Sequence, residues 1–297
     1  MPTLEALSAQ HDVALVVSQP ERPAGRGRSM TPTPIASWAR EHALASRMPS
    51  DVNDPAEIGA IHGVRADAFV VIAFGQKLST ALLEGAFAIN LHASLLPAYR
   101  GAAPINWAMI DGCAMTGVSV IALAQRMDAG VVFATRSTLI DPSETAGELH
   151  DRLARLGPDA IMSTLEHFAH GTIEGIMQDE STATKARKLS KDDGRIDLST
   201  LSAFEARCRI HGLSPWPGCD VSIGGSPTRL LRVREHEGDG EAGSVQADTT
   251  IACRTGRLEV LELQPHGGKP MSLAQYRNGR SFDVGTRVTQ LVKDGVP

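Results

Sequence analysis

A change in the pattern of apolar residues near residue 170 limits most strongly how this chain can fold. Before that point, apolar runs such as Ala68–Ala73 and Thr116–Leu123 alternate with segments of helical periodicity such as Pro34–Leu44. This alternation predicts an α/β domain built on a mostly parallel sheet. Beyond Asp197, short alternating segments separated by glycines predict a small β-barrel with five strands: Cys219–Ile223, Thr228–Glu237, Gly243–Gln246, Thr250–Arg254 and Leu258–Gln264.

The segment between these two patterns is polar and lacks apolar periodicity, which is typical of a linker. We therefore predict a first domain over residues 1–171, a linker over 172–190 and a second domain over 191–297. The first domain is expected to end in a long helix, Thr145–His170, that is interrupted at Gly157 and Pro158. A terminal helix is expected over Met271–Asn278, and the last residues of the chain are expected to fray.

The charge of the chain is divided unequally between its two parts. The net charge is −5, but residues 1–180 carry 12 Lys and Arg against 20 Asp and Glu, whereas residues 181–297 carry 17 against 14. The part with the α/β pattern is thus acidic, and the remainder is mildly basic and suited to face phosphate groups. By itself, an excess of three positive charges is weak evidence for a nucleic-acid partner.

Cysteine usage and apolar runs restrict the compartment and the cofactors. The four cysteines form no C-x-x-C pair and have no histidine at zinc spacing, so we expect buried thiols and neither disulfides nor a bound metal. No apolar run has the length of a membrane span, and the first residues do not resemble a signal peptide. These features predict a cytoplasmic protein without a membrane partner, which we expect to be a monomer.

The segment from Asn90 to Pro104 gives the strongest indication of chemistry. It follows the apolar run Ala86–Ile89, which predicts a short buried strand, and its Pro and Gly residues predict a loop. Strand alternation places Asn90 and His92 on one side, at an edge of the sheet where α/β proteins bind ligands. Asp128, in the loop after the next strand, could reach His92 and favour the charged form of its ring.

An amide, a histidine and an aspartate together suit the attack of an amine on a carbonyl carbon without an enzyme nucleophile. Asn90 would donate to the developing oxyanion, and His92 would stabilise it or move the proton. Asp128 would accept a proton from the amine, directly or through water. The alternative is structural, with Asn90 and His92 satisfied at a strand end and Asp128 capping a turn. The adjoining Ser-Leu-Leu-Pro and Tyr-Arg-Gly-Ala-Ala-Pro motifs favour the catalytic interpretation.

The chain resembles the folate-dependent formyltransferases in the stretch Asn90-Leu-His-Ala-Ser-Leu-Leu-Pro-Ala-Tyr-Arg-Gly-Ala-Ala-Pro104 and in Met-Asp128-Ala-Gly downstream. The resemblance extends over nearly the whole chain and includes Ser214-Pro-Trp-Pro-Gly218. Within the family, Gln19-Pro-Glu-Arg-Pro-Ala-Gly-Arg-Gly is similar to the Arg-rich loop of the members that act on tRNA. The resemblance implies a Rossmann-like catalytic domain followed by an OB-like barrel that binds tRNA.

This resemblance implies transfer of a formyl group from 10-formyltetrahydrofolate to the amino group of methionine on initiator methionyl-tRNA. It assigns catalysis to Asn90, His92 and Asp128, with no metal. Phe74 and Gly75 stand where the family lines its pterin pocket, although simple core packing explains Phe74 equally well. One turn is expected to shape the folate site mainly with backbone groups: Ser94, Leu95, Leu96 and Pro97.

The resemblance also implies two places of contact with tRNA. Three arginines of the loop over residues 19–34 are expected to enter the acceptor arm and to place its amino end at the catalytic loop: Arg22, Arg26 and Arg28. A basic cluster at the end of the linker includes Lys188 and Lys191. For this cluster, phosphate contact and an ordinary solvated surface are equally good interpretations.

The beginning of the chain departs from the family, which has a first strand and a Gly-Thr-Pro-containing loop before its first helix. This sequence begins in what resembles the middle of that helix, and the absence of a central strand would leave strand edges unpaired. We favour the explanation that Met1 stands for an internal residue of a longer chain. The alternative is a genuinely shortened protein that folds poorly. For the function, the alternatives are a formyltransferase acting on an amino sugar nucleotide, which we expect to lack the Arg-rich loop, and a catalytically impaired RNA-binding relative.

Overall fold

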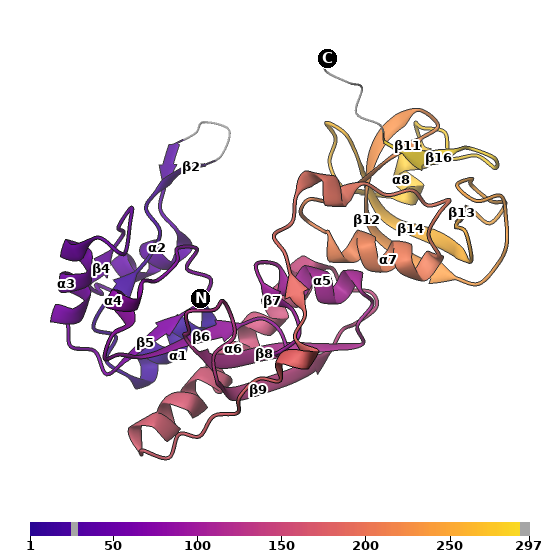
Figure 1. Cartoon of the computed structure of the whole chain (residues 1–297). Helices are drawn as coiled ribbons and strands as arrows, with labels where there is room; N and C mark the ends of the chain where they lie inside the picture. Colours follow the sequence, from indigo (N-terminus) through magenta and orange to yellow (C-terminus); the bar gives the residue numbers. More distant parts are fainter. Residues whose placement is uncertain (25–28, 292–297) are drawn as a thin grey trace. The chain divides into compact units, whose positions relative to one another are not determined.

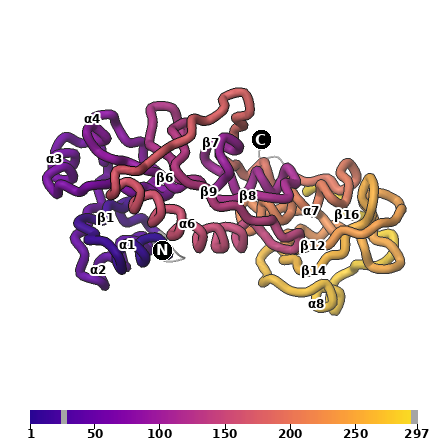
Figure 2. The backbone as a smooth tube through the Cα atoms, turned by 90° about the horizontal axis from the view of Figure 1, so that it is seen from below, coloured from indigo at the N-terminus to yellow at the C-terminus, as the bar shows by residue number. Residues whose placement is uncertain are grey.

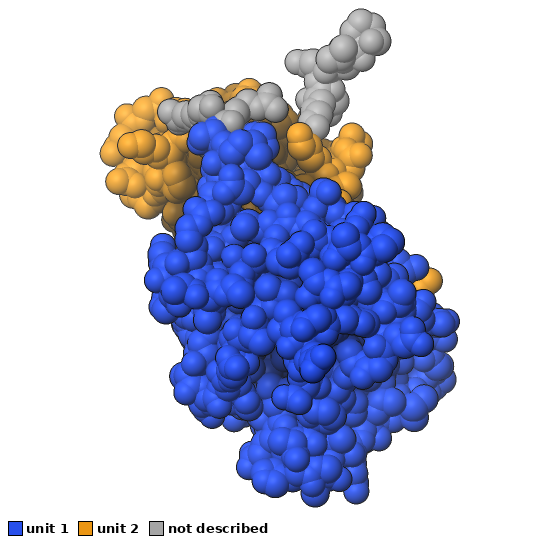
Figure 3. Space-filling view, turned by 90° about the vertical axis from the view of Figure 1, so that its left-hand side faces the viewer, with its two compact units in different colours: residues 1–100, 117–137, 152–184 blue, residues 101–116, 138–151, 185–297 orange. Residues whose placement is uncertain are grey.

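The computed structural model describes residues 1–24 and 29–291, and these form two compact units (Figure 3). The first unit comprises residues 1–100, 117–137 and 152–184, and the second comprises residues 101–116, 138–151 and 185–297. The units therefore do not follow chain order, because two segments of the N-terminal half pack with the C-terminal half. The domain limits derived from the sequence stay a prediction.

The first unit has the predicted alternation of strands and helices (Figure 1). Its largest sheet has the order β5 (Ala68–Val71), β6 (Phe87–His92), β8 (Met115–Ala122), β9 (Val132–Leu139). A separate parallel pair joins β1 (Val16–Val17) to β4 (Ser46–Arg47), and a hairpin joins β2 (Arg22–Ala24) to β3 (Ser29–Thr31). In the described ranges, β1 and β5 do not pair with each other.

The helices that belong wholly or mainly to this unit are α1 (Pro2–Gln10), α2 (Pro34–Glu41), α3 (Pro55–Gly63), α4 (Thr80–Leu83) and α6 (Ala146–Ala169). A proline occupies the first position of α2 and of α3, where its missing N–H costs nothing. The preceding Thr33 and Asp54 side chains accept hydrogen bonds from the amides of Ala36 and Ala56. The predicted interruption of α6 was wrong, because the helix continues through Pro158.

The direction of β8 differs from that expected for a mostly parallel sheet. β5 and β6 are parallel, but β6 and β8 are antiparallel, with Ile89 opposite Ala122 and His92 opposite Ser119. The sequence did not distinguish these arrangements, since a buried apolar run is compatible with either. The carboxyl ends of β6 and β8 therefore lie at opposite ends of their shared ladder.

Helix α6 lies against one face of β6 (Figures 1 and 2). A Cβ atom added to Gly157 of α6 would lie 2.6 Å from Cδ2 of Leu91 and 3.0 Å from Oγ1 of Thr3 in α1. Both contacts are shorter than a side chain tolerates, so glycine permits this close approach. Because neighbouring strand residues alternate, Asn90 and His92 point away from the face that Leu91 presents to α6.

The second unit contains the predicted β-barrel, which the structure confirms. The antiparallel strand order is β13 (Ile251–Ala252), β14 (Arg257–Pro265), β12 (Ser226–His236), β11 (Cys219–Ile223), β16 (Val288–Gln290). Two isolated bridges, Ser244 to Arg287 and Val245 to Ile251, connect the β16 side with β13 and close the ring. The remaining strand of the sheet, β15 (Met271–Ser272), pairs with β14.

Three details of the barrel differ from the sequence prediction. Residues 243–246 contribute isolated bridges instead of a strand, and the predicted terminal helix begins with β15 before α8 (Leu273–Arg277). β16 was missed because its three residues contain a single apolar side chain, Val288, which is 1% exposed. Residues 288–290 pair with β11, and the last residues, which are expected to fray, lie outside the described range.

The other elements of the chain are short, apart from α7. They are β7 (Arg100–Gly101), α5 (Pro104–Ile110), the 3-10 turns Glu180–Thr182 and Lys191–Gly194, β10 (Lys185–Ala186) and α7 (Ala203–Gly212). The four cysteines are free, with Cys113 half-buried and the others buried. Among the helices in the described ranges, none combines the length and apolar character needed to cross a bilayer.

His211 joins α7 to the barrel from a fully buried position. Its Nδ1 lies 3.1 Å from the carbonyl oxygen of Pro142, which can only accept, so Nδ1 carries the proton. Its Nε2 accepts a hydrogen bond of 3.0 Å from the amide of Val233. Burial, followed by the nearby charges of Arg207 and Arg232, lowers the pKa of His211 to about 4. The ring is therefore held in one neutral tautomer.

We expect His211 to make the protein less stable as the pH falls from about 6.5 towards 4. In this pH range the unfolded chain binds a proton that the folded chain does not. This difference in proton binding lowers the free energy of unfolding by at most about 3 kcal/mol. His211→Gln should flatten the dependence of stability on pH, measured by denaturant unfolding between pH 4 and 8. His170→Gln, at an exposed histidine, should leave it unchanged; an unaltered slope in His211→Gln would contradict the assignment.

Candidate active site

His92 is buried at the end of β6, and both of its ring nitrogens face oxygen atoms. Nε2 lies 2.9 Å from the carbonyl oxygen of Tyr99, and Nδ1 lies 3.6 Å from Oδ2 of Asp128. The two side chains are 7% and 13% exposed, so solvent screens their interaction only weakly. The structure thus brings together the histidine and the aspartate that the sequence singled out.

The contact with Tyr99 determines the protonation of the ring. A carbonyl oxygen only accepts hydrogen bonds, so Nε2 of His92 must carry a proton and donate it. Nδ1 is then the nitrogen that can gain or lose a proton, and it faces the Asp128 carboxylate. At 3.6 Å the pair is in electrostatic contact but slightly beyond hydrogen-bond distance, as is common for catalytic groups without substrate.

The path of the loop that brings Asp128 to His92 was not predicted from the sequence. The end of β8 lies beside Ile89, so the loop between β8 and β9 must return to bring the carboxylate to His92. Asp128 has a φ of +54°, a left-handed conformation that residues other than glycine rarely adopt. Where the loop ends, a Cβ on Gly130 would lie 1.8 Å from the carbonyl oxygen of Ala122, so only glycine fits.

Asn90 lies on the same face of β6 as His92, two residues earlier. Its side chain is half-buried. In the part of the chain that the structure describes, no hydrogen bond links its amide to another residue. The amide can therefore donate to an oxygen atom of a bound substrate without breaking an internal contact.

The turn after His92 is braced by two buried serines. Ser94 donates from Oγ to the carbonyl oxygen of Ala98 at 2.6 Å. Ser119 of β8 donates to the carbonyl oxygen of Ser94 at 2.7 Å and accepts from the amide of Leu96 at 3.1 Å. The turn is therefore rigid without a ligand. Its role in folate binding stays a prediction for the four residues Ser94, Leu95, Leu96 and Pro97.

Phe74 and Gly75 follow β5 at the edge of the same unit. Phe74 is half-buried and packs against the small apolar core of this region, as expected for a structural side chain. Its carbonyl oxygen accepts from Nε2 of Gln19 at 2.8 Å, and Oε1 of Gln19 accepts from Arg22 at 2.9 Å. The predicted pterin-lining segment is thus connected to one predicted tRNA-binding arginine.

The predicted tRNA-binding residues fall in both units. Arg22 is exposed on the β2–β3 hairpin, whereas Arg26 and Arg28 lie outside the described residues. Lys188 and Lys191 are exposed in the second unit. The neighbouring arginines of this cluster form ion pairs with aspartates, namely Arg187 with Asp193 and Arg195 with Asp192.

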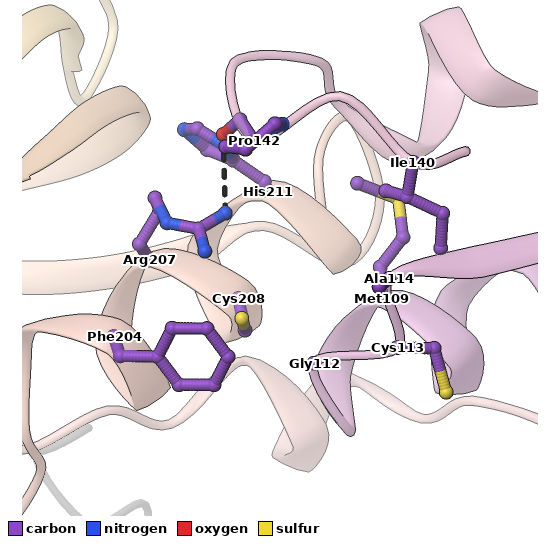
Figure 4. Close-up of a pocket in the computed structure, with 10 residues that line it drawn as sticks. All are labelled: Met109, Gly112, Cys113, Ala114, Ile140, Pro142, Phe204, Arg207, Cys208 and His211. Atoms are coloured by element: carbon purple, nitrogen blue, oxygen red, sulfur yellow. Dashed lines mark hydrogen bonds between the residues drawn. The ribbon is translucent and has the colours of Figure 1, made fainter.

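A hollow of about 180 Å³ lies in the second unit, and none of the residues predicted to act lines it (Figure 4). Its lining residues are Met109, Gly112, Cys113, Ala114, Ile140, Pro142, Phe204, Arg207, Cys208 and His211. Arg207 points across it and donates to the carbonyl oxygen of Pro142 at 3.1 Å. Within residues 1–24 and 29–291, no group of three His, Cys, Asp or Glu side chains is arranged to hold a metal ion.

Sequence reasoning missed the groups that hold the predicted residues in place. The carbonyl of Tyr99 is a backbone group, which no side-chain pattern indicates. Arg100 belongs to the Tyr-Arg-Gly motif, which was noted without a role, and its guanidinium contacts Gln178 at 2.7 and 2.9 Å. Gln178 lies in a polar segment with no pattern that could have identified it.

Two family models match the chain. The model described as "Formyl transferase" matches residues 3–165, and the one described as "Formyl transferase, C-terminal domain" matches residues 188–281. A protein of Paracoccus denitrificans named "Methionyl-tRNA formyltransferase" is 40% identical over 284 residues, which is 95% of this chain and 94% of that protein. A protein of Ectopseudomonas mendocina with the same name is 37% identical over 92% of this chain and 89% of its own length.

Solved structures share the fold at low sequence identity. An N-formyltransferase from Helicobacter canadensis, in complex with folinic acid and dTDP-3-aminofucose, gives a TM-score of 0.66 at 14% identity and covers 87% of this chain and 93% of its own. HypX from Aquifex aeolicus in complex with tetrahydrofolic acid gives 0.60 at 18% identity over 80% of this chain. This chain spans 43% of HypX. Together with the family models, these likenesses confirm the predicted fold class.

We expect Ser119→Ala to destabilise the turn after His92. The substitution leaves the amide of Leu96 and the carbonyl of Ser94 without their buried partner, at a cost of about 1–3 kcal/mol. The free energy of unfolding, measured in urea, should fall by this amount. Ser163→Ala on α6, a half-buried serine without a comparable bridging role, serves as the matched control. Equal stability of the two variants would show that the turn does not depend on the Ser119 hydroxyl.

Proposed function

The chain belongs to the formyl transferase family, and from this premise we propose that it transfers a formyl group from 10-formyltetrahydrofolate to the amino group of methionine on initiator methionyl-tRNA. The observation that carries the catalytic part of this proposal is the contact between His92 and Asp128. Asn90 lies on the same face of β6, and its amide makes no hydrogen bond within residues 1–24 and 29–291. Because translation begins in the cytoplasm, we place the reaction there.

The three side chains divide the chemistry of amine attack on a formyl carbon. As the new carbon–nitrogen bond forms, the carbonyl oxygen becomes negative, and the Asn90 amide donates to it. Asp128 takes the proton that the attacking nitrogen loses, and His92 stabilises the oxyanion or passes the proton on. The proton finally goes to the folate nitrogen that leaves when its bond to carbon breaks.

Two other functions fit the sequence less well. The likeness to sugar N-formyltransferases lies at 13–19% identity, which supports the fold and not the acceptor. Relatives at 36–40% identity over most of the chain carry a tRNA substrate in their names. A purely RNA-binding role does not account for the contact between His92 and Asp128, with Asn90 on the same face of β6 as His92.

We expect the protein to form formylmethionyl-tRNA when incubated with 10-formyltetrahydrofolate and charged initiator tRNA. Asn90→Ala should lower kcat by roughly 100- to 1000-fold, the usual loss for an oxyanion donor, with little change in KM for tRNA. Asn278→Ala, at an exposed asparagine of the second unit, should behave as wild type. Formylation of an amino sugar nucleotide in place of tRNA would overturn the proposal, as would tRNA binding without any transfer.

We also expect Arg22 to contribute to tRNA affinity. Arg22→Ala should raise KM for tRNA by about tenfold, because a hydrogen bond between charged groups is lost, and reduce the salt dependence of binding by about one unit of slope. The matched control is Arg155→Ala on the exposed side of α6. Steady-state kinetics and filter binding at several salt concentrations measure both effects. Unchanged tRNA affinity in Arg22→Ala would contradict the assignment.

A further inference from the structure

Gln178 holds the loop that carries Asp128. Its Nε2 donates to the carbonyl oxygen of Asp128 at 2.8 Å and to that of Gly130 at 2.7 Å. A side-chain amide has two N–H groups, so both are used on this one loop. The backbone beside Gln178 is itself fixed, because Ile176 and Val132 exchange two hydrogen bonds of 2.9 Å. The loop is therefore attached to a firm support.

Arg100 fixes the orientation of the Gln178 amide. Nε and Nη2 of Arg100 donate to Oε1 of Gln178 at 2.9 and 2.7 Å. Because arginine can only donate, the oxygen of the amide must face Arg100 and its nitrogen must face the loop. The same guanidinium donates to both carboxylate oxygens of Glu180, at 3.1 and 3.0 Å.

Glu180 completes the network. It also accepts from Arg126, and the hydrogen bonds from Arg100 and then Arg126 lower the pKa of Glu180 to about 2. The Arg100 side chain is 10% exposed, so its paired charge is shielded from water on most sides. Arg100 is thus held at one end by a carboxylate and presents its other edge to Gln178.

Arg100 also adjoins the support of His92. The preceding residue, Tyr99, provides the carbonyl oxygen that accepts from Nε2 of His92. One continuous path therefore runs from the ring of His92 through the backbone of Tyr99 and Arg100 to Gln178 and the Asp128 loop. This path connects His92 with Asp128, and the distance between these two side chains determines the geometry for proton transfer.

The Asp128 loop needs such a support because its backbone is strained. Asp128 has a φ of +54°, and a non-glycine residue in this region costs about 1–3 kcal/mol unless its surroundings impose it. The two hydrogen bonds from Gln178 hold the carbonyl group of Asp128, whose peptide plane sets the ψ angle of this residue, and the carbonyl group of Gly130. Without them, the loop can relax and withdraw the carboxylate from His92.

We propose that Gln178 and Arg100 are positioning residues that set the geometry of the His92–Asp128 pair for formyl transfer, an inference that rests on the proposed function. They act through the loop and through Tyr99 and do not touch the substrates. Loss of the clamp should therefore lower the rate of the chemical step and leave substrate binding intact.

The test replaces the amide of Gln178 by a carboxylate of the same shape. Gln178→Glu keeps the contact with Arg100 but places an oxygen against the carbonyls of Asp128 and Gly130. We expect kcat for formyl transfer to fall roughly 10- to 100-fold, since small misplacement of a catalytic group has effects of this size. KM for tRNA and for the folate should stay as in wild type. Gln264→Glu, whose amide also binds a backbone carbonyl but in the barrel, is the matched control.

A double-mutant cycle with Asp128→Asn separates positioning from a general loss of structure. If Gln178 acts through Asp128, then Gln178→Glu should cause little further loss of kcat in the Asp128→Asn background. Full additivity, or a wild-type kcat in Gln178→Glu, would overturn the inference. Thermal unfolding shows whether Gln178→Glu is folded. If Gln178→Glu is not folded, Arg100→Lys takes its place in the cycle, because lysine cannot make the two hydrogen bonds that Arg100 makes to Gln178. Absence of formyl transfer by the wild type would instead reject the proposed function.

Discussion

The candidate site depends on the ring of His92, whose two nitrogens make different contacts. The hydrogen bond from Nε2 of His92 to the Tyr99 carbonyl fixes both the orientation and the tautomer of the ring. Only Nδ1 remains for exchange of a proton, and it faces Asp128 at 3.6 Å. The carboxylate of Asp128 must therefore lie beside Nδ1 of His92, and the conformation of the Asp128 loop places it there.

Local patterns in the sequence indicated candidate site residues because they report on neighbours along one strand. The alternation over Asn90 and His92 correctly placed both on one face, and the motif that follows them was recognised from its residues alone. The approach of Asp128 was anticipated without its route, since apolar runs do not reveal that β6 and β8 are antiparallel. Likewise, three residues with one apolar side chain gave no indication of β16, whose pairing arises from the closure of the barrel.

The second unit is organised by burial more than by charge. Its barrel closes through isolated bridges at Ser244 and Val245, and the neutral His211 ties α7 to β12 inside it. The basic character that the composition indicates is partly cancelled, because Arg187 and Arg195 pair with aspartates. Within residues 1–24 and 29–291, no ion pair joins Lys188 or Lys191 to a carboxylate, so these two exposed lysines remain candidates for the phosphate contact proposed for that cluster.

The geometry also bears on which group takes the first proton from the attacking amine. If His92 were the acceptor, Nδ1 would have to turn from Asp128 towards the substrate, and the contact with Tyr99 would be broken or strained. A carboxylate accepts a proton without such a rotation of the ring, and Oδ2 of Asp128 already lies beside Nδ1 of His92. In the proposed mechanism, Asp128 therefore accepts the proton from the amine. His92 keeps its place beside the carboxylate through its hydrogen bond to the Tyr99 carbonyl.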